Sequence, residues 1–153
     1  MASRRRARNP EHENVMIAIR GMQFFTGEAD SDEIETVNRG YFYRENGGIV
    51  LEFDELYEDT TERTHTRLRI RDGELLLTRT GFISVEMDFT KGKKSLSLYQ
   101  LPFGEILLGI DTKSVIIEES PEEILIRADY SMEINYQFLT DSSLKISVKP
   151  VLF

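Results

Sequence analysis

Basic side chains occur at every second position between residues 63 and 71, and this pattern has the clearest chemical potential in the chain. Its members are Arg63, His65, Arg67, Arg69 and Arg71. On a β-strand, residues two apart share one face about 6.6 Å from each other, so they would form a single cationic stripe. Such a stripe could bind phosphates of a nucleic acid, although no aromatic side chain is interleaved for base stacking. It could also pair with carboxylates of neighbouring strands, such as Glu52, Asp54 and Glu74. We favour pairing because the chain is acidic overall.

Residues suited to catalysis or metal binding are scarce. The chain has no cysteine and only two histidines, which excludes disulfides, thiolate metal sites and cysteine nucleophiles. His65 lies between two threonines, a setting more typical of a hydrogen-bonded strand residue than of a general base. The chain lacks a G-x-S-x-G motif, and the D-S-D-E run at 30–33 lacks the glycine and final glutamate of a calcium loop. We therefore expect a non-enzymatic protein without a metal or another cofactor.

Tyrosines in alternating apolar segments are the second group of candidate residues. A buried tyrosine must place its hydroxyl on a polar partner, so several on an inward face indicate polar groups or water inside the protein. The small residues Ala128 and Gly109 would leave room beside them. We expect a partly open cavity near one mouth of the fold, in contact with Tyr130 or Tyr136, and a fully packed interior is the alternative. The candidate ligand-binding residues are Tyr41, Tyr43, Tyr130 and Tyr136.

The elements that must position these residues are β-strands, because apolar residues recur with a period of two from Val15 onward. The clearest example is Ile124–Phe138, in which even-numbered positions are mostly apolar and odd-numbered ones mostly polar. In a strand the two sets lie on opposite faces. These fifteen residues exceed the usual strand length, so we expect a bend or bulge among them.

Shorter strands are expected along the rest of the chain, separated by turns. Asn46-Gly47 and Asp72-Gly73 are preferred hairpin pairs, and the register should change near Asp111–Ser114. Most connections are short, which enforces antiparallel neighbours. Closing about ten such strands into a barrel removes exposed edges, and a two-sheet sandwich is the competing arrangement. Besides Ile124–Phe138, the expected strands are Val15–Phe24, Ile34–Arg44, Ile49–Phe53, Thr64–Ile70, Leu75–Thr80, Phe82–Phe89, Leu96–Leu98, Ile106–Ile110, Val115–Ile117 and Leu144–Val148, with a longer loop at Gly27–Glu33 and a turn at Thr140–Ser143.

Charge divides the chain into two parts. Residues 1–14 contain four arginines and two glutamates, whereas the whole chain has a net charge of −8. This first segment has no apolar stretch, so we expect a basic, disordered extension and not a secretory signal. Residues 15–153 should then form one β-barrel domain, since 153 residues suit a single domain. Apolar runs of about 18 residues, the minimum for a membrane-spanning helix, are absent, and we expect a cytoplasmic protein.

Five segments, in order along the chain, carry a resemblance to a known family. They are IAIRGMQ at 17–23, TTERTHTRLRIRDGE at 60–74, LTRTGFISVEMDFTKGKK at 77–94, LPFGEILLGIDTKS at 101–114 and DYSMEIN at 129–135. Together they resemble the YwiB-like family of uncharacterised bacterial proteins, and the resemblance implies a calycin-like, lipocalin-related antiparallel β-barrel. It implies no catalytic residue and no ligand. The charged residues Arg63, His65 and Arg67, the residue Leu101 and the arginine-rich start depart from the family's pattern.

The predicted fold is an all-β, antiparallel up-and-down barrel of calycin-like (lipocalin-like) type with about 8–10 strands. The predicted function is a non-enzymatic binding module, with a small molecule in the barrel mouth or a protein partner on the outer wall. The alternative is an electrostatic module that docks on RNA or a nucleoprotein complex through the N-terminal arginines and the stripe at 63–71. Nucleic acid is the less favoured partner, no membrane is expected, and a homo-oligomer stays open.

Overall fold

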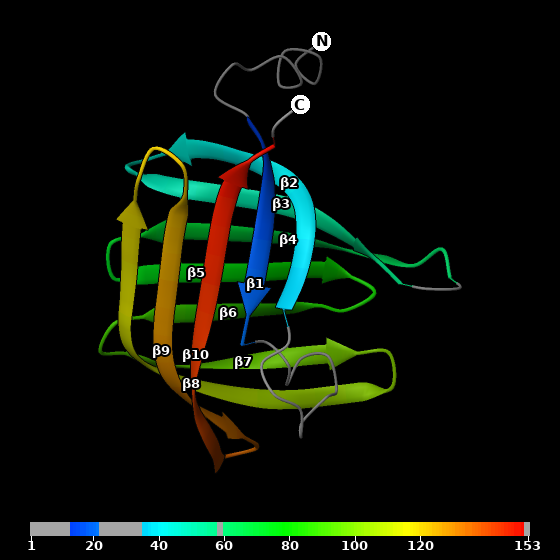
Figure 1. Cartoon of the computed structure of the whole chain (residues 1–153). Helices are drawn as coiled ribbons and strands as arrows, with labels where there is room; N and C mark the ends of the chain where they lie inside the picture. The colour runs from blue at the N-terminus through cyan, green and yellow to red at the C-terminus, as the bar shows by residue number, and fades with distance from the viewer. Residues whose placement is uncertain (1–12, 22–34, 58–59, 152–153) are drawn as a thin grey trace.

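A computed structural model describes residues 13–21, 35–57 and 60–151, and its regular structure consists of β-strands (Figure 1). The strands are β1 (Glu13–Arg20), β2 (Glu35–Glu45), β3 (Gly48–Leu56), β4 (Arg63–Arg71), β5 (Glu74–Gly81), β6 (Val85–Thr90), β7 (Lys94–Leu101), β8 (Gly104–Glu119), β9 (Ile124–Ile134) and β10 (Gln137–Pro150). Within these ranges there is no helix that could cross a membrane. The expected acidic loop at 27–33, and all of the expected extension except Glu13 and Asn14, lie outside the described residues.

The ten strands form one antiparallel sheet in the order β6-β5-β4-β3-β2-β1-β10-β9-β8-β7. Strands that follow each other in the sequence are therefore paired, with the exception of β6 and β7, which lie at the two ends of this order. In addition, the first strand, β1, pairs with the last strand, β10. Between β6 and β7 one bridge, Ser84 with Gln100, joins the two ends of the sheet. The sheet is thus a nearly closed barrel, which confirms the fold class expected from the period-two pattern.

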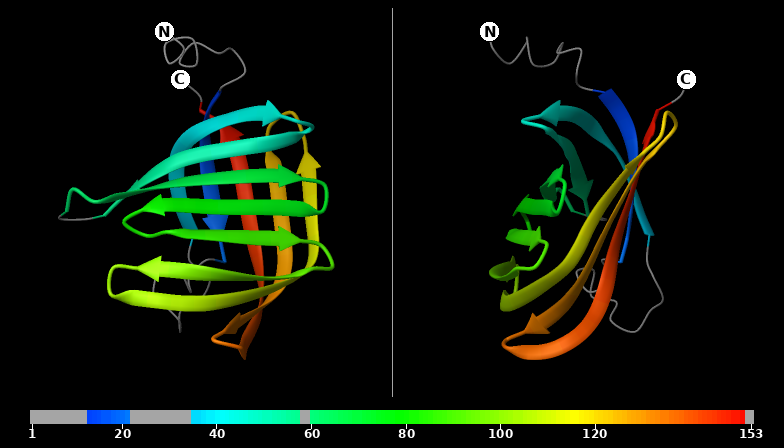
Figure 2. Two further views of the ribbon diagram at one scale, coloured as in Figure 1. Left: turned by 180° about the vertical axis from the view of Figure 1, so that it is seen from behind. Right: turned by 90° about the vertical axis from the view of Figure 1, so that its left-hand side faces the viewer.

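The barrel wall has two layers whose strands cross at a steep angle (Figure 2). Strands β3 to β7 lie in one layer, and β9, β10 and β1 lie in the other. The long strand β8 bends from the first layer into the second, and its pairing with β9 shifts register between Thr112 and Ser114. This is the expected register change near Asp111–Ser114, and such a bulge increases the local bend of a strand.

One hydrophobic core fills the barrel, built from the inward residue of each alternating pair. In β4 the inward residues Thr64, Thr66, Leu68 and Ile70 are buried, as the alternation predicts. The fully buried large side chains come from both layers, so the layers pack against each other directly. They include Ile17, Leu51, Leu68, Leu75, Leu77, Met87, Phe89, Tyr99, Leu108, Ile110 and Tyr130.

The expected single strand Ile124–Phe138 is wrong. Strand β9 ends at Ile134, and a tight turn at Asn135 and Tyr136 reverses the chain into β10. Both turn residues have positive φ, 49° and 71°, a conformation that asparagine tolerates better than most residues. The Asn135 amide N–H donates to the Leu107 carbonyl at 2.9 Å, and its side-chain oxygen accepts from the Leu107 N–H at 3.3 Å. The expected turn at Thr140–Ser143 consequently lies inside β10.

Candidate functional site

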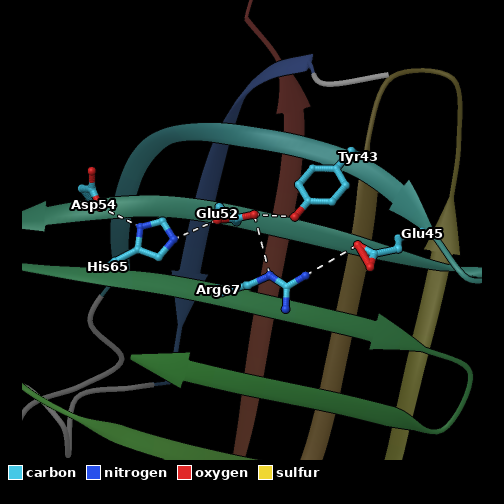
Figure 3. Close-up of polar contacts among 6 residues, drawn as sticks. All are labelled: Tyr43, Glu45, Glu52, Asp54, His65 and Arg67. Carbon is cyan, nitrogen blue, oxygen red and sulfur yellow. Dashed lines mark hydrogen bonds and ion pairs between the residues drawn. The ribbon is translucent and has the colours of Figure 1, made fainter. Parts of the chain in front are cut away.

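The stripe predicted from residues 63–71 lies on the outer wall of the barrel, and its centre is a charge cluster around His65 (Figure 3). Strand pairing places His65 opposite Asp54 and Arg67 opposite Glu52. The two ring nitrogens of His65 each lie 2.8 Å from a carboxylate oxygen, Nδ1 from Asp54 and Nε2 from Glu52. Because an ionised carboxylate can only accept a hydrogen bond, this geometry requires a proton on both nitrogens.

Glu52 is the hub of this cluster, which comprises Tyr43, Glu45, Glu52, Asp54, His65 and Arg67 (Figure 3). Besides His65, its carboxylate accepts a hydrogen bond from the Tyr43 hydroxyl and lies 3.7 Å from Nε of Arg67. Arg67 also reaches Glu45 on β2, 3.6 Å away. Side-chain contacts within the cluster therefore link β2, β3 and β4, in addition to the backbone pairing of these strands.

The surroundings change the pKa of both His65 and Glu52. Desolvation opposes a charge on His65, but the hydrogen bonds to Asp54 and Glu52 outweigh it and raise the pKa of the imidazole. Desolvation likewise opposes a charge on Glu52, and the hydrogen bonds from Tyr43 and His65 outweigh it and lower the pKa of the carboxyl. The shifts thus favour the charged form of both residues, and the cluster sets two cations, His65 and Arg67, against three carboxylates.

The predicted carboxylate partners of the stripe are the ones that the structure uses. Glu52 and Asp54 contact His65, Glu52 contacts Arg67, and Glu74 lies 3.1 Å from Arg71. Arg63 and Arg69 are also exposed on this wall. Among the described residues, no three histidine, cysteine, aspartate or glutamate side chains are arranged to hold a metal ion. With its ring nitrogens engaged, His65 is poorly placed to exchange protons with a substrate.

The four candidate tyrosines do not come together in a barrel mouth, which corrects that expectation. Tyr136 is 73% exposed in the β9–β10 turn, because β9 ends before the alternation reaches it. Tyr41 is exposed and Tyr43 lies on the outer wall, because Gly40 and Phe42 take the inward positions of β2. Tyr130 alone of the four is buried in the core.

Tyr130 packs edge-on against Phe89, with ring centroids 5.1 Å apart, and burial raises the pKa of its hydroxyl. A surface hollow of about 580 Å³ does reach Tyr130. Its other residues are mostly charged or hydroxyl side chains of the outer wall: Lys113, Ser114, Asp129, Asp141, Ser142, Ser143 and Lys145. The hollow beside Tyr130 is therefore mainly polar, whereas the sequence led us to expect a cavity with apolar walls.

An ion pair between the buried Arg79 and the partly exposed Glu55 escaped the sequence reasoning. Arg79 on β5 is 6% exposed, and its Nη2 donates to both carboxylate oxygens of Glu55 on β3, at 2.9 and 3.1 Å. Its Nη1 donates to the Tyr99 hydroxyl on β7 at 3.2 Å, and Thr66 donates to Glu55 at 2.9 Å. The sequence does contain a signal for this pair: Arg79 follows Leu75 and Leu77 at a spacing of two residues, which places all three side chains on the inward face of β5.

A groove of about 750 Å³ crosses the outer wall over β2, β1, β10, β9 and β8. Strand pairing aligns Val37, Ala18, Ser147 and Leu125 across four strands, and we call this line the neutral row. Val37 is 54% exposed and Leu125 43%, and Ile116 beside them is 52% exposed. No contiguous stretch of sequence contains this site, because its strands come from both ends of the chain.

Cationic side chains border the neutral row on both sides. On one side, pairing aligns Arg20, Lys145 and Arg127 on β1, β10 and β9, and we call these the first cationic row. On the other side, Met16 lies between Arg39 and Lys149, which form the second cationic row. The groove also carries three carboxylates: Glu35 is paired with Arg20, Glu118 is paired with Leu125, and Glu123 accepts a hydrogen bond from the Ser147 hydroxyl in the neutral row.

Comparison with known proteins supports the fold and gives no activity. Residues 17–146 match the family described as a domain of unknown function, DUF1934. The chain is 25% identical over 107 residues to the uncharacterized beta-barrel protein YwiB of Bacillus subtilis (strain 168), covering 70% of this chain and 74% of that protein. The crystal structure of ywiB protein from Bacillus subtilis superposes with a TM-score of 0.73 at 20% sequence identity, covering 93% of this chain and 94% of that one.

Proposed function

The chain belongs to the DUF1934 family of β-barrel proteins, and from that premise we propose that it is a non-enzymatic binding module that holds a protein partner on its outer wall. The observation that carries the proposal is the groove of about 750 Å³ with exposed Val37, Ile116 and Leu125 along it. We place this activity in the cytoplasm, since a chain without cysteine makes no use of an oxidising compartment.

The filled interior favours the outer wall over the barrel mouth. Ala128, which was expected to leave space for a ligand, is fully buried within the core cluster. The polar end of the interior is occupied by the Arg79–Glu55 pair, which already satisfies both carboxylate oxygens of Glu55. A small molecule bound inside would have to displace these contacts.

The groove has the composition of a protein-binding surface. Interfaces combine an apolar centre, which loses water on binding, with a polar and charged rim that orients the partner. Here the neutral row and Ile116 provide the centre, and the two cationic rows provide the rim. Exposed apolar groups grouped in this way are a common mark of interaction sites.

The stripe at 63–71 supports the alternative, RNA docking, less well. His65, Arg67 and Arg71 already contact carboxylates, and a phosphate would have to compete with Asp54, Glu52 and Glu74 at each of them. The arginines at positions 4–8 lie outside the described residues. We therefore propose no nucleic-acid function for this wall.

A displayed library of short peptides tests the proposed function. Peptides selected on the intact protein should lose affinity about tenfold or more for Val37→Asp and for Leu125→Asp, because each change puts a charge into the apolar centre. Leu96→Asp is the matched control, since Leu96 is equally exposed on β7, outside the groove. The proposal fails if the wild-type protein enriches no peptide, or if the selected peptides bind both groove variants as well as wild type.

A further inference from the structure

We infer that the partner held by the groove is a second copy of this chain, an inference that rests on the proposed function. Two copies meet face to face through the same outer wall, in an arrangement with twofold symmetry. Such a contact requires a surface that is complementary to itself, because the same patch faces the interface on both copies. The charge, the shape and the size of the groove meet this requirement.

The groove carries charges of both signs in nearly equal number. Its cations are Arg20, Arg127, Lys145 and Lys149, and its carboxylates are Glu35, Glu118 and Glu123. The chain as a whole has a net charge of −8, so much of its surface repels a second copy. Over the groove this repulsion is small, because the local charges nearly cancel.

These charges suit an identical partner better than a partner with charges of one sign. Several are already balanced within the chain: Arg20 contacts Glu35 at 3.3 Å, and Glu123 accepts a hydrogen bond from Ser147. An acidic segment would meet the carboxylates of the groove and a basic segment its cations, whereas a second copy presents both signs. Exposed ion pairs contribute little to stability, so contacts within one copy can be replaced by equivalent contacts between two.

The neutral row has a profile that can interlock with its own copy. The small residues Ala18 and Ser147 occupy its centre, with Val37 on one side and Leu125 on the other. Val37 is 54% exposed and Leu125 is 43% exposed, so two large side chains flank a depression over two small ones. A large side chain of one copy can fill the depression of the other, and the twofold axis makes this contact reciprocal. Sheets that pack face to face interdigitate their side chains in this way.

The outer wall is large enough for a dimer interface. A standard interface buries about 800 Å² and about 20–30 residues on each partner. Fifteen residues line the groove, and they lie on five neighbouring strands, β2, β1, β10, β9 and β8. Tyr41, which is 54% exposed, continues the same face of β2 four positions from Val37, and tyrosine is enriched at interfaces. Because the groove alone provides only part of a standard interface, we expect a dissociation constant of about 10 μM.

Analytical ultracentrifugation of the full chain tests the inference. Between about 1 and 200 μM, the average mass should rise from that of one chain toward that of two. Val37→Asp and Leu125→Asp should each weaken the dimer about tenfold or more, because each places a charge in the apolar centre of both copies. Leu96→Asp is the matched control and should leave the dimer unchanged, since Leu96 is 53% exposed and lies on β7, outside the groove.

A second pair of variants separates local charge balance from overall charge. Glu118→Lys and Glu86→Lys change the net charge of the chain equally, and both lower the long-range repulsion between copies. Glu118 lines the groove, whereas Glu86 is exposed on β6. We expect Glu118→Lys to weaken the dimer about fivefold, because it removes a carboxylate from the interface side of both copies, and Glu86→Lys not to weaken it. Equal effects of the two variants would contradict the self-complementary charge of the groove.

Methyl NMR during dilution locates the contact without any substitution. The methyl groups of Val37, Ile116 and Leu125 should shift as the dimer dissociates, and those of Leu96 should not. The interface is thereby identified even if a groove variant does not fold. Shifts that are confined to residues outside the groove would overturn the inference.

The outcomes distinguish the two proposals. A wild-type chain that stays monomeric at the highest concentration, while selected peptides bind the groove, overturns the inference and leaves the proposed function standing. A dimer that persists in both Val37→Asp and Leu125→Asp also overturns the inference, because another surface then forms it. A monomer that enriches no peptide overturns both proposals.

Discussion

At the scale of single residues, His65 couples the outer-wall cluster to pH. Its pKa is raised in the folded protein because Asp54 and Glu52 accept hydrogen bonds from both ring nitrogens. A group whose pKa is raised on folding stabilises the fold fully below its unfolded pKa, about 6.5, and loses that contribution as pH rises through the folded value. We expect the wild-type protein to lose stability above about pH 6.5 relative to His65→Gln. Urea unfolding of both proteins from mildly acidic to mildly basic pH checks this, and parallel curves would contradict it.

Ala128 tests whether the interior is packed. Replacing this fully buried residue with leucine adds volume to a filled core and should destabilise the fold by about 1–3 kcal/mol. The matched control is Ala18→Leu, because Ala18 lies in the neutral row on the outer face of β1. Chemical denaturation should show a clear loss for Ala128→Leu and almost none for Ala18→Leu. A neutral Ala128→Leu would mean that the core has room for a ligand.

Side-chain direction was predictable for residues inside long alternating strands and not at strand ends. The alternation of β4 correctly separated Thr64, Thr66, Leu68 and Ile70 from the exposed stripe. It failed for Tyr136, because nothing local showed that the hairpin would turn at Asn135. It was not applied to Arg79, since a buried arginine becomes plausible only when Glu55, from a distant strand, is known to face it.

At the scale of elements, the Arg79 side chain links strands on both sides of the weakest seam of the barrel. It reaches Glu55 on β3 and Tyr99 on β7, whereas β6 and β7 form no continuous ladder: the Ser84–Gln100 bridge lies just before β6, and the Ser95 hydroxyl donates to the Asp88 carbonyl at 2.8 Å. Arg79→Met should cost about 1–3 kcal/mol, because it leaves the partly exposed Glu55 without its cation. Arg79→Met with Glu55→Leu should recover part of that loss. A double variant less stable than Arg79→Met alone, measured by thermal or urea unfolding, would contradict this account.

The order of the strands was largely predictable, whereas their long-range pairing was not. Turns such as Asn46-Gly47, with φ of 52° and 78°, specify a local hairpin, and the bulge of β8 follows from the broken alternation near Lys113. The pairing of β1 with β10 joins residues more than a hundred positions apart, and no local signal specifies it. The groove depends on that pairing, so sequence reasoning concentrated on β4 and missed the cationic rows.

At the scale of the whole molecule, the barrel separates packing from binding. The inner face is buried and apolar apart from one charged end, while the outer face carries two different surfaces. Over β2 to β4 a cluster of outer charges is paired around Glu52, and over β1, β9 and β10 exposed apolar side chains lie among charges of both signs. We predict that the surface over β1, β9 and β10 binds a protein partner, and that the charge cluster over β2 to β4 stabilises the fold.

Methyl NMR during a titration with a peptide selected from the displayed library tests this central claim most directly. The methyl groups of the groove should shift as peptide is added, those of Met16, Val37, Ile116 and Leu125, since they lie at the proposed contact. Interior methyl groups such as those of Leu51, Leu108 and Met132 should stay in place, because the core is packed away from the partner. Shifts confined to the interior methyl groups, with those of Val37 and Leu125 unchanged, would contradict the account.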